Sequence, residues 1–370
     1  MKLDKFALII LLVCIIGGAA FYFSDQKSEK FADQESGRIF ASGLTAKVND
    51  IKKITVKNKS STSNFVLQGD AWVMSEKDNY PVQFGKIKQL ILNIADLQTL
   101  ESKTSNPTSY GKLGVQAVGE AGSIDSKQVI LFDKADNVVL SLIVGKTKSS
   151  SQAGLSSLYA RKDSEKKSWL LKGQVTLPAN DTDWLEKSII NIAQDRIQKV
   201  SISNKENKLA FNKNEKKDEK FTLSNLPSNL ELKSDNELKT IAGALQNLSF
   251  NNVKASSSFE KDGKEIAQAE FITFNGLSLF VSTTEVENKH YIWIETKADE
   301  SNTEAANESK ELNAKLSSWV YEVASFKAKN FTKTLLDITK EIKKDEAKEE
   351  VKIDQSKADV VAPVMEHKIE

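Results

Sequence analysis

The sequence is poor in the side chains that carry most nucleophilic and metal chemistry. Its 370 residues include a single cysteine, Cys14, and two histidines, His290 and His367. A nucleophilic Ser or Cys usually needs a nearby base, most often His, and a metal site built from imidazole or thiolate needs several such ligands. Because Cys14 lies in an apolar N-terminal run, the rest of the chain can form no disulfide. We therefore expect no enzymatic activity, no cofactor, and no catalytic, cofactor-binding or metal-binding residues.

The polar residues that first attract attention have structural explanations. His367 lies in a charged C-terminal segment, and His290 in KHYIWIE is expected to be an exposed residue at the start of a strand. Asp181 and Asp183 in NDTDW are expected to cap a helix rather than to bind calcium. The chain has no GxxxxGKS or GxxxxGKT loop for nucleotide phosphates. Hydrolysis by paired carboxylates is a third hypothesis, since the chain has 51 Asp and Glu residues, although nothing in the sequence selects a pair among them.

The charge balance gives the chain no strong attraction to nucleic acid. There are 52 basic and 51 acidic residues, so the chain as a whole is nearly neutral. Only Arg38, Arg161 and Arg196 offer the planar fork that suits phosphate, and the other basic residues are lysines. We therefore expect no nucleic-acid partner.

The N-terminus carries an apolar run of membrane-spanning length. Residues 6–23, FALIILLVCIIGGAAFYF, contain no charged side chain. As a helix rising about 1.5 Å per residue the run would span roughly 27 Å, close to a hydrocarbon core of about 30 Å. Three interpretations compete: a retained anchor, a signal peptide cleaved after Ala20, and a lipoprotein signal. Val13 stands where a lipoprotein signal has a small residue before its cysteine, and the aromatic residues 21–23 suit a membrane interface, which favours the anchor.

The short basic segment before this run is how export signals begin. We therefore predict a single-pass protein of the bacterial cytoplasmic membrane that contacts this membrane through residues 6–23, with the bulk of the chain periplasmic or otherwise extracytoplasmic.

A phrase that occurs twice predicts an internal duplication. Residues 51–59 read IKKITVKNK and residues 197–205 read IQKVSISNK. In the first half, FVL and AWVM flank the turn QGD as in a β-hairpin, and a helical stretch with apolar residues spaced by three and four follows. In the second half Leu238, Ile241, Leu245 and Leu248 repeat this helical spacing. Each half continues with three further predicted strands, so we expect two similar units.

The predicted fold class is α+β: two tandem repeats, each an antiparallel sheet with a packed amphipathic helix, behind an N-terminal transmembrane helix. Near the end, LSSWVYEVASF admits both a helical face and a strand alternation, and the segment after residue 342 is charged with few apolar residues. The predicted order is an anchor at 1–23, a stalk at 24–47, a first repeat at 48–180, a linking helix at 181–194, a second repeat at 195–300, a C-terminal element completing the fold at 301–341, and a disordered charged tail at 342–370.

Several packing motifs resemble a known family. They are FVLQGDAWVM, GKIKQLILNIADLQTL, SYGKLGV, LYAR, DTDWLEKSIINI and WVYEVASFKAKNF. Together they are similar to the family of the DUF4340 domain of unknown function over roughly residues 48–330. The resemblance implies a membrane-anchored extracytoplasmic protein, similar to the auxiliary component of gliding-motility-type ABC transport systems, and it brings no catalytic residues with it.

Two further functional hypotheses follow. The first is a non-enzymatic accessory subunit of an ABC-type transport or envelope complex, with integral-membrane or envelope proteins as partners. The alternative is an envelope module that binds a glycan or a peptide through exposed aromatic side chains. Trp72, Trp169 and Trp293 in predicted strands and Trp184 in the linking segment are mostly expected in the core or on a sheet face.

Overall fold

The computed structural model describes residues 36–120, 123–149, 156–204, 208–260 and 265–342. The predicted anchor at 1–23, most of the predicted stalk and nearly all of the predicted tail lie outside the described residues. Among the residues that are described, no helix has the length and apolar character needed to cross a membrane. The fold mixes α and β structure, with antiparallel sheets and few helices.

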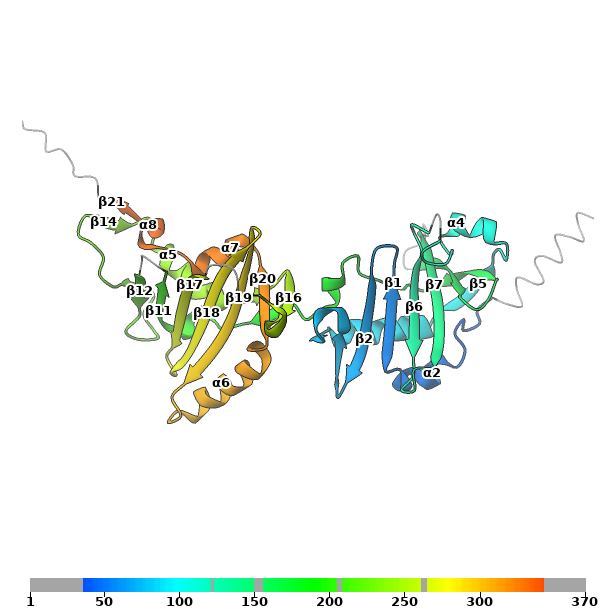
Figure 1. The fold of residues 1–370 in the computed structure, drawn as a ribbon, viewed down its shortest axis with the longest axis horizontal. Coiled ribbons are helices and arrows are strands. Elements are labelled where there is room, and N and C mark those ends of the chain that lie inside the picture. The colour runs from blue at the N-terminus through cyan, green and yellow to red at the C-terminus, as the bar shows by residue number, and fades with distance from the viewer. Residues whose placement is uncertain (1–35, 121–122, 150–155, 205–207, 261–264, 343–370) are drawn as a thin grey trace, which may run out of the picture.

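We call residues 36–187 the first lobe (Figure 1). Its nine-stranded antiparallel sheet has the order β4-β3-β2-β1-β6-β7-β8-β9-β5. The strands are β1 Lys53–Lys57, β2 Thr62–Gln68, β3 Ala71–Met74, β4 Tyr80–Pro81, β5 Gln98–Ser102, β6 Lys127–Phe132, β7 Val138–Ser149, β8 Ser156–Lys162 and β9 Ser168–Lys172. The helices are α2 Leu44–Lys47, η1 Val48–Asp50, η2 Ser75–Lys77, α3 Phe84–Ala95, η3 Pro107–Ser109, α4 Tyr110–Leu113 and η4 Asp181–Trp184.

We call residues 188–342 the second lobe. Its eight-stranded antiparallel sheet has the order β13-β12-β11-β17-β18-β19-β20-β16, with two small sheets, β10-β15 and β14-β21, beside it. The strands are β10 Ser188–Ile190, β11 Ile197–Ser203, β12 Lys208–Asn212, β13 Thr222–Leu223, β14 Leu230–Leu232, β15 Leu248–Ser249, β16 Asn252–Ala255, β17 Glu265–Thr273, β18 Leu277–Val286, β19 Lys289–Ala298, β20 Trp319–Val323 and β21 Thr339–Glu341. The helices are η5 Gln194–Arg196, α5 Asn236–Ala242, η6 Gly243–Leu245, η7 Ser256–Ser258, α6 Thr303–Leu316, α7 Ser325–Ala328, η8 Lys329–Phe331 and α8 Leu335–Ile338.

The local predictions in the first half are confirmed. The hairpin of β2 and β3 turns at Gly69 and Asp70, where the glycine adopts a left-handed φ of 57° that it reaches without steric cost. Helix α3 buries the predicted stripe, including Ile87 and Ile94, which are 0% exposed. In the second half the helix is shorter than predicted: α5 ends at Ala242, Leu245 lies in η6, and Leu248 begins β15.

The predicted stalk is wrong over the residues that are described. Phe40, Ala41 and Leu44 are buried in the core of the first lobe, and the ring of Phe40 packs edge-on against Trp169 with centroids 6.4 Å apart. These apolar side chains draw the segment onto the sheet because their burial is favourable. The folded body therefore begins before residue 40.

The predicted linking helix at 181–194 is also wrong. The segment forms the single turn η4, the strand β10 and the turn η5. Ile189 and Ile190 are both buried, and because successive side chains of a strand point to opposite faces, β10 is covered on both sides. Asp181 caps no helix; its carboxylate accepts hydrogen bonds from the hydroxyls of Ser61 and Ser63 at 3.2 and 3.0 Å.

The C-terminal element resolves the ambiguity at LSSWVYEVASF in favour of a strand. Trp319–Val323 form β20, which pairs with both β19 and β16. Helix α6, which precedes it, packs against β19 through a buried contact between Ser309 and Thr296, whose hydroxyl oxygens lie 2.9 Å apart.

Candidate functional site

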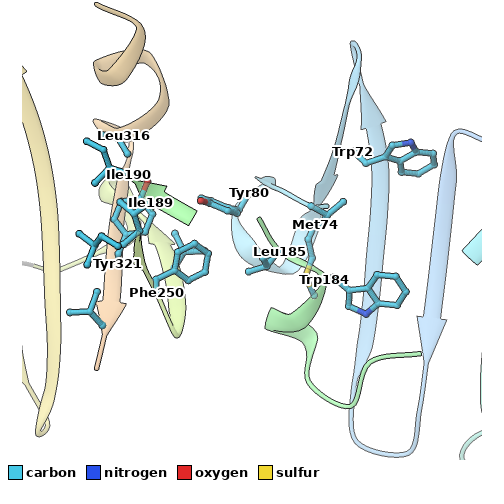
Figure 2. Close-up of a cluster of buried hydrophobic side chains, with 14 of the residues drawn as sticks. Trp72, Met74, Tyr80, Trp184, Leu185, Ile189, Ile190, Phe250, Leu316 and Tyr321 are labelled. Carbon is cyan, nitrogen blue, oxygen red and sulfur yellow. The ribbon is translucent and has the colours of Figure 1, made fainter. Parts of the chain in front are cut away.

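The two lobes meet at an aromatic joint formed by Tyr80, Phe250, Trp319 and Tyr321. Figure 2 shows Tyr80, Phe250 and Tyr321 of this joint. Tyr80 comes from β4 of the first lobe, and the other three rings come from the second lobe. The Tyr80 ring is edge-on to all three, with centroid distances of 5.3 Å to Phe250, 4.8 Å to Trp319 and 6.5 Å to Tyr321. Edge-to-face packing of this kind is favourable beyond the burial of area alone. The hydrophobic core is therefore continuous from one lobe to the other.

Polar contacts at the edge of the aromatic joint reinforce it. Lys77 Nζ donates to Asn252 Oδ1 at 2.9 Å, and the backbone N–H of Ala255 donates to Asp78 Oδ2 at 2.9 Å. Asp78 has a left-handed φ of 54°, within a tight turn that presents its side chain to β16. These bonds fix the edge of the second sheet against the first lobe.

The hydroxyl of Tyr80 donates to the backbone oxygen of Glu186 at 3.2 Å. Burial raises the pKa of both the Tyr80 and the Tyr321 hydroxyl well above the usual range. Both phenols therefore stay neutral at any physiological pH, and the joint is not a titrating switch.

Next to the joint lies a cleft of about 390 Å³ between helix α3 and the segment 176–187. Leu90 and Trp184, both buried, form part of its floor, and the indole of Trp184 packs on Phe65 with centroids 4.8 Å apart. The cleft is lined by Gln83, Lys86, Gln89, Leu90, Asn93, Thr176, Pro178, Asp183, Trp184 and Lys187. Side chains one helical turn apart on α3 thus face the connection between the lobes.

The charged side chains of the cleft form hydrogen bonds within the cleft. Asp183 accepts hydrogen bonds from Lys187 Nζ at 2.6 Å and from Asn180 Nδ2 at 3.3 Å. The hydrogen bond from Lys187 is the main reason that the pKa of Asp183 is lowered. Lys86 Nζ donates to the backbone oxygen of Asp183, and Gln83 Nε2 to that of Leu185 at 2.8 Å. Asp183 is therefore an ionised structural anion rather than an acid poised to give up a proton.

The cleft has the composition of a recognition site. Amide, hydroxyl and ammonium groups surround an apolar floor, which suits a small polar ligand or an extended segment of another molecule. Within the described ranges, no group of three or more His, Cys, Asp or Glu residues is arranged to hold a metal ion.

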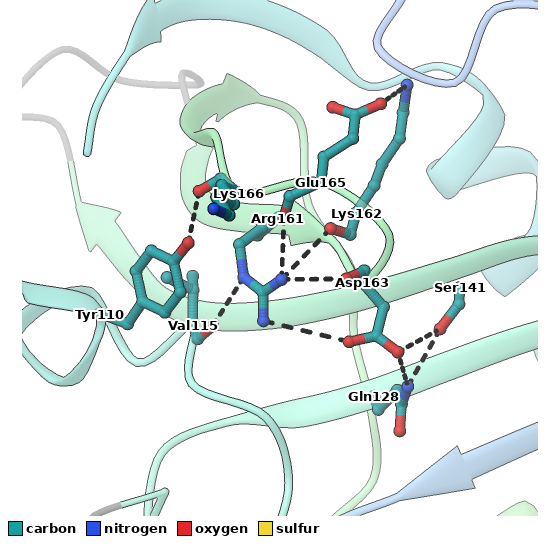
Figure 3. A network of polar contacts seen from close by, with 9 residues as sticks. All are labelled: Tyr110, Val115, Gln128, Ser141, Arg161, Lys162, Asp163, Glu165 and Lys166. Carbon is teal, nitrogen blue, oxygen red and sulfur yellow. Dashed lines mark hydrogen bonds and ion pairs between the residues drawn. The ribbon is translucent and has the colours of Figure 1, made fainter. Parts of the chain in front are cut away.

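A second polar cluster lies on the first lobe around Arg161, which is 6% exposed (Figure 3). Its Nε donates to Val115 O at 3.2 Å, and its Nη1 donates to the backbone oxygens of Asp163 and Glu165 at 3.1 and 2.9 Å. The guanidinium also lies 4.8 Å from the ring centroid of Tyr110. Since its donors bind the protein's own carbonyl groups, Arg161 fastens the segment carrying Tyr110 and Val115 to the sheet instead of offering a phosphate site.

The residues singled out in the sequence are mostly structural. His290 is the second residue of β19 and is half-buried rather than exposed, with Nδ1 3.7 Å from Glu285 Oε2. Trp72 and Trp184 are buried, Trp169 packs against the core and Trp293 is half-buried. Sequence reasoning missed Tyr80, because nothing around it indicates that its partners lie more than 150 residues away.

The comparisons with known proteins agree with the resemblance. A family described as "Domain of unknown function (DUF4340)" matches residues 72–269, more than half of the chain. The chain belongs to this family. The DUF4340 match includes the whole cleft together with Tyr80 and Phe250, whereas Trp319 and Tyr321 lie beyond it. No curated protein matches the chain.

Proposed function

We propose that this DUF4340 protein is a non-enzymatic, membrane-anchored extracytoplasmic protein that acts as an accessory subunit of an ABC-type transport or envelope complex. Residues 6–23 would hold it in the bacterial cytoplasmic membrane, and the two lobes would form a rigid body that contacts integral-membrane or envelope proteins. The observation that carries this proposal is the continuous core through the aromatic joint.

The arrangement of the sheets supports a spacer role. The β16 edge of the second sheet lies against η2 of the first lobe, so the two sheets follow one another along the long axis (Figure 1). At about 4.8 Å between neighbouring strands, such a body extends on the order of 70 Å. The polypeptide enters the body at one end and its last described strand, β21, lies at the other. A body of this form can hold a partner at a fixed distance from the membrane.

We also propose that the lobes arose by duplication and pack as two related units. In both sheets the opening hairpin pairs its first strand with the strand that follows the helical region: β1 with β6, and β11 with β17. In both, the strand that precedes this partner, β5 or β16, forms the far edge of the sheet. The recurrence of IKKITVKNK as IQKVSISNK at β1 and β11 supports a common origin.

Crosslinking in intact cells followed by mass spectrometry tests the function. The full chain is compared with a version in which residues 6–23 are replaced by a cleavable signal peptide. Recovery of ATPase and permease subunits with the anchored form alone is the expected result. Recovery of no transporter subunit with either form would contradict the accessory role.

The cleft favours a second candidate, an envelope module that binds a glycan or a peptide. Because Trp184 lines the cleft, a ligand seated there would change its fluorescence. Titration with soluble peptidoglycan fragments and with envelope peptides tests this, and Asn93→Ala, on the cleft side of α3, is the matched variant. A fluorescence change that is the same in the variant and the parent would place the ligand elsewhere.

A further inference from the structure

The chain enters the folded body along the β5 edge of the first sheet. The Gly37 N–H donates to Thr99 O at 2.6 Å, the Thr99 N–H donates to Arg38 O at 2.9 Å, and the Phe40 N–H donates to Leu97 O at 2.8 Å. Ile39 forms an antiparallel bridge with Gln98. Residues 37–40 thus extend the sheet by one short strand, and anything that holds the N-terminus also holds this edge.

The connection between the apolar run and this edge is short. Residues 24–36 can span at most about 45 Å even when fully extended. The far end of the body lies on the order of 70 Å from the β5 edge. If residues 6–23 span the membrane, the β5 edge is the part of the body held closest to it.

The β5 edge has the composition of a membrane-contacting surface. Ile39 is 44% exposed, and Leu100, the extra residue of a β-bulge in β5, is 38% exposed. Two exposed basic residues lie beside them: Arg38 precedes Ile39, and Lys172 pairs with Gln98, the same residue that Ile39 opposes.

The acidic residue next to Leu100 is paired. Glu101, next to Leu100, forms an ion pair with Lys103 at 2.6 Å. The charges of Arg38 and Lys172 are therefore not cancelled by it, and the edge combines two exposed apolar side chains with two cations. This combination fits the boundary between anionic lipid headgroups and the outer part of the acyl chains.

We propose that the β5 edge is a lipid-contact site, at which Ile39 and Leu100 touch the membrane and Arg38 and Lys172 bind anionic headgroups. The proposal rests on the membrane anchor proposed above and adds an orientation to it: the first lobe is proximal to the membrane and the second lobe is distal. The body then stands on one end, with α8 and β21 farthest from the lipid.

Site-specific quenching in vesicles tests this orientation. The full chain carries one cysteine, so Cys14→Ser gives a background for single labels. A fluorophore is attached to Leu100→Cys or, as a control at the opposite end, to Leu336→Cys, where the parent leucine is 71% exposed. The proteins are reconstituted into vesicles of phosphatidylcholine and phosphatidylglycerol that contain lipid with a headgroup nitroxide.

Quenching at position 100 without quenching at position 336 is the expected result. Quenching at both positions would mean that the body lies flat on the membrane. Quenching at neither position, in protein that still floats with the vesicles, would mean that the edge does not touch the lipid. Either result would overturn the contact site but leave the anchor intact. Failure to float with the vesicles would overturn the anchor and the contact site together.

Charge variants separate lipid contact from proximity alone. Each basic side chain near an anionic surface contributes about fivefold to binding, so Arg38→Ser and Lys172→Ser together should weaken the contact by about that factor per charge. Replacing phosphatidylglycerol by phosphatidylcholine should have the same effect on the parent. An unchanged quenching signal in both cases would show that the edge is near the membrane without binding its headgroups. Because both side chains are exposed, circular dichroism should report an unchanged fold.

Discussion

Replacing Tyr80 by alanine tests whether the aromatic joint makes the two lobes one cooperative unit. The Tyr80 side chain is 3% exposed and contacts three rings of the second lobe. Truncating a buried aromatic side chain costs about 3–5 kcal/mol, and we expect Tyr80→Ala to lie in this range because the rings on both sides leave little room for collapse. Tyr80→Phe keeps the ring and removes the hydroxyl that donates to Glu186 O, and it should cost about 1 kcal/mol.

The assay is thermal unfolding by calorimetry of the full chain in detergent, with a matched control. Tyr110→Ala removes a buried tyrosine from the first lobe far from the joint, so it should lower the stability of that lobe by a similar amount. Tyr80→Ala should in addition split the unfolding into two transitions, one for each lobe, because the lobes no longer stabilise one another. A single transition in Tyr80→Ala, or the same splitting in Tyr110→Ala, would refute the reasoning.

Three further predictions concern the rest of the body. Gly145→Ala should destabilise the first lobe by about 1–3 kcal/mol in urea unfolding, since its Cβ would lie 2.3 Å from the backbone oxygen of Leu113. Arg161→Lys should cost about 2–3 kcal/mol by the same measurement, because a single lysine ammonium cannot reach all the carbonyl groups that the guanidinium fork bonds at once. The hydrogen bond from Arg196 lowers the pKa of Glu308. The Arg196–Glu308 pair should stabilise the fold by under about 1 kcal/mol, because it is partly exposed. This stabilisation should be present above about pH 4.5 and be lost as the pH falls further. Glu308→Gln should remove this pH dependence when stability is measured across an acid titration.

The local sequence pattern predicted those parts of the fold that depend on residues close together in the chain. The hairpin around Gly69 and helix α3 follow from turn chemistry and apolar spacing, and both are present. Helix α6 could not be found in this way. It buries only Ala305, Ser309 and Leu316, and one of these is a polar residue that bonds to Thr296, so the helix has no continuous apolar stripe.

The candidate site depends on contacts that no local pattern contains. Tyr80 follows the tight turn at Asp78, which gives no sign of distant partners, and the rings it contacts come from the β15–β16 segment and from β20. The linking segment misled the prediction because adjacent apolar residues such as Ile189 and Ile190 fit one face of a short helix as well as they fit a strand covered on both sides. The cleft was not predicted at all, since its two walls, α3 and residues 176–187, are separated by about 90 positions in the sequence.

The position of Tyr80 also has a consequence for biosynthesis. Synthesis proceeds from the N-terminus, and the first lobe is complete once β9 and the linking segment have emerged. Tyr80 must then wait for Phe250, Trp319 and Tyr321, so an aromatic side chain stays uncovered on an already folded lobe until nearly the whole chain has been made. Nascent chains stalled before residue 319 should therefore be the form of this protein that chaperones retain most strongly.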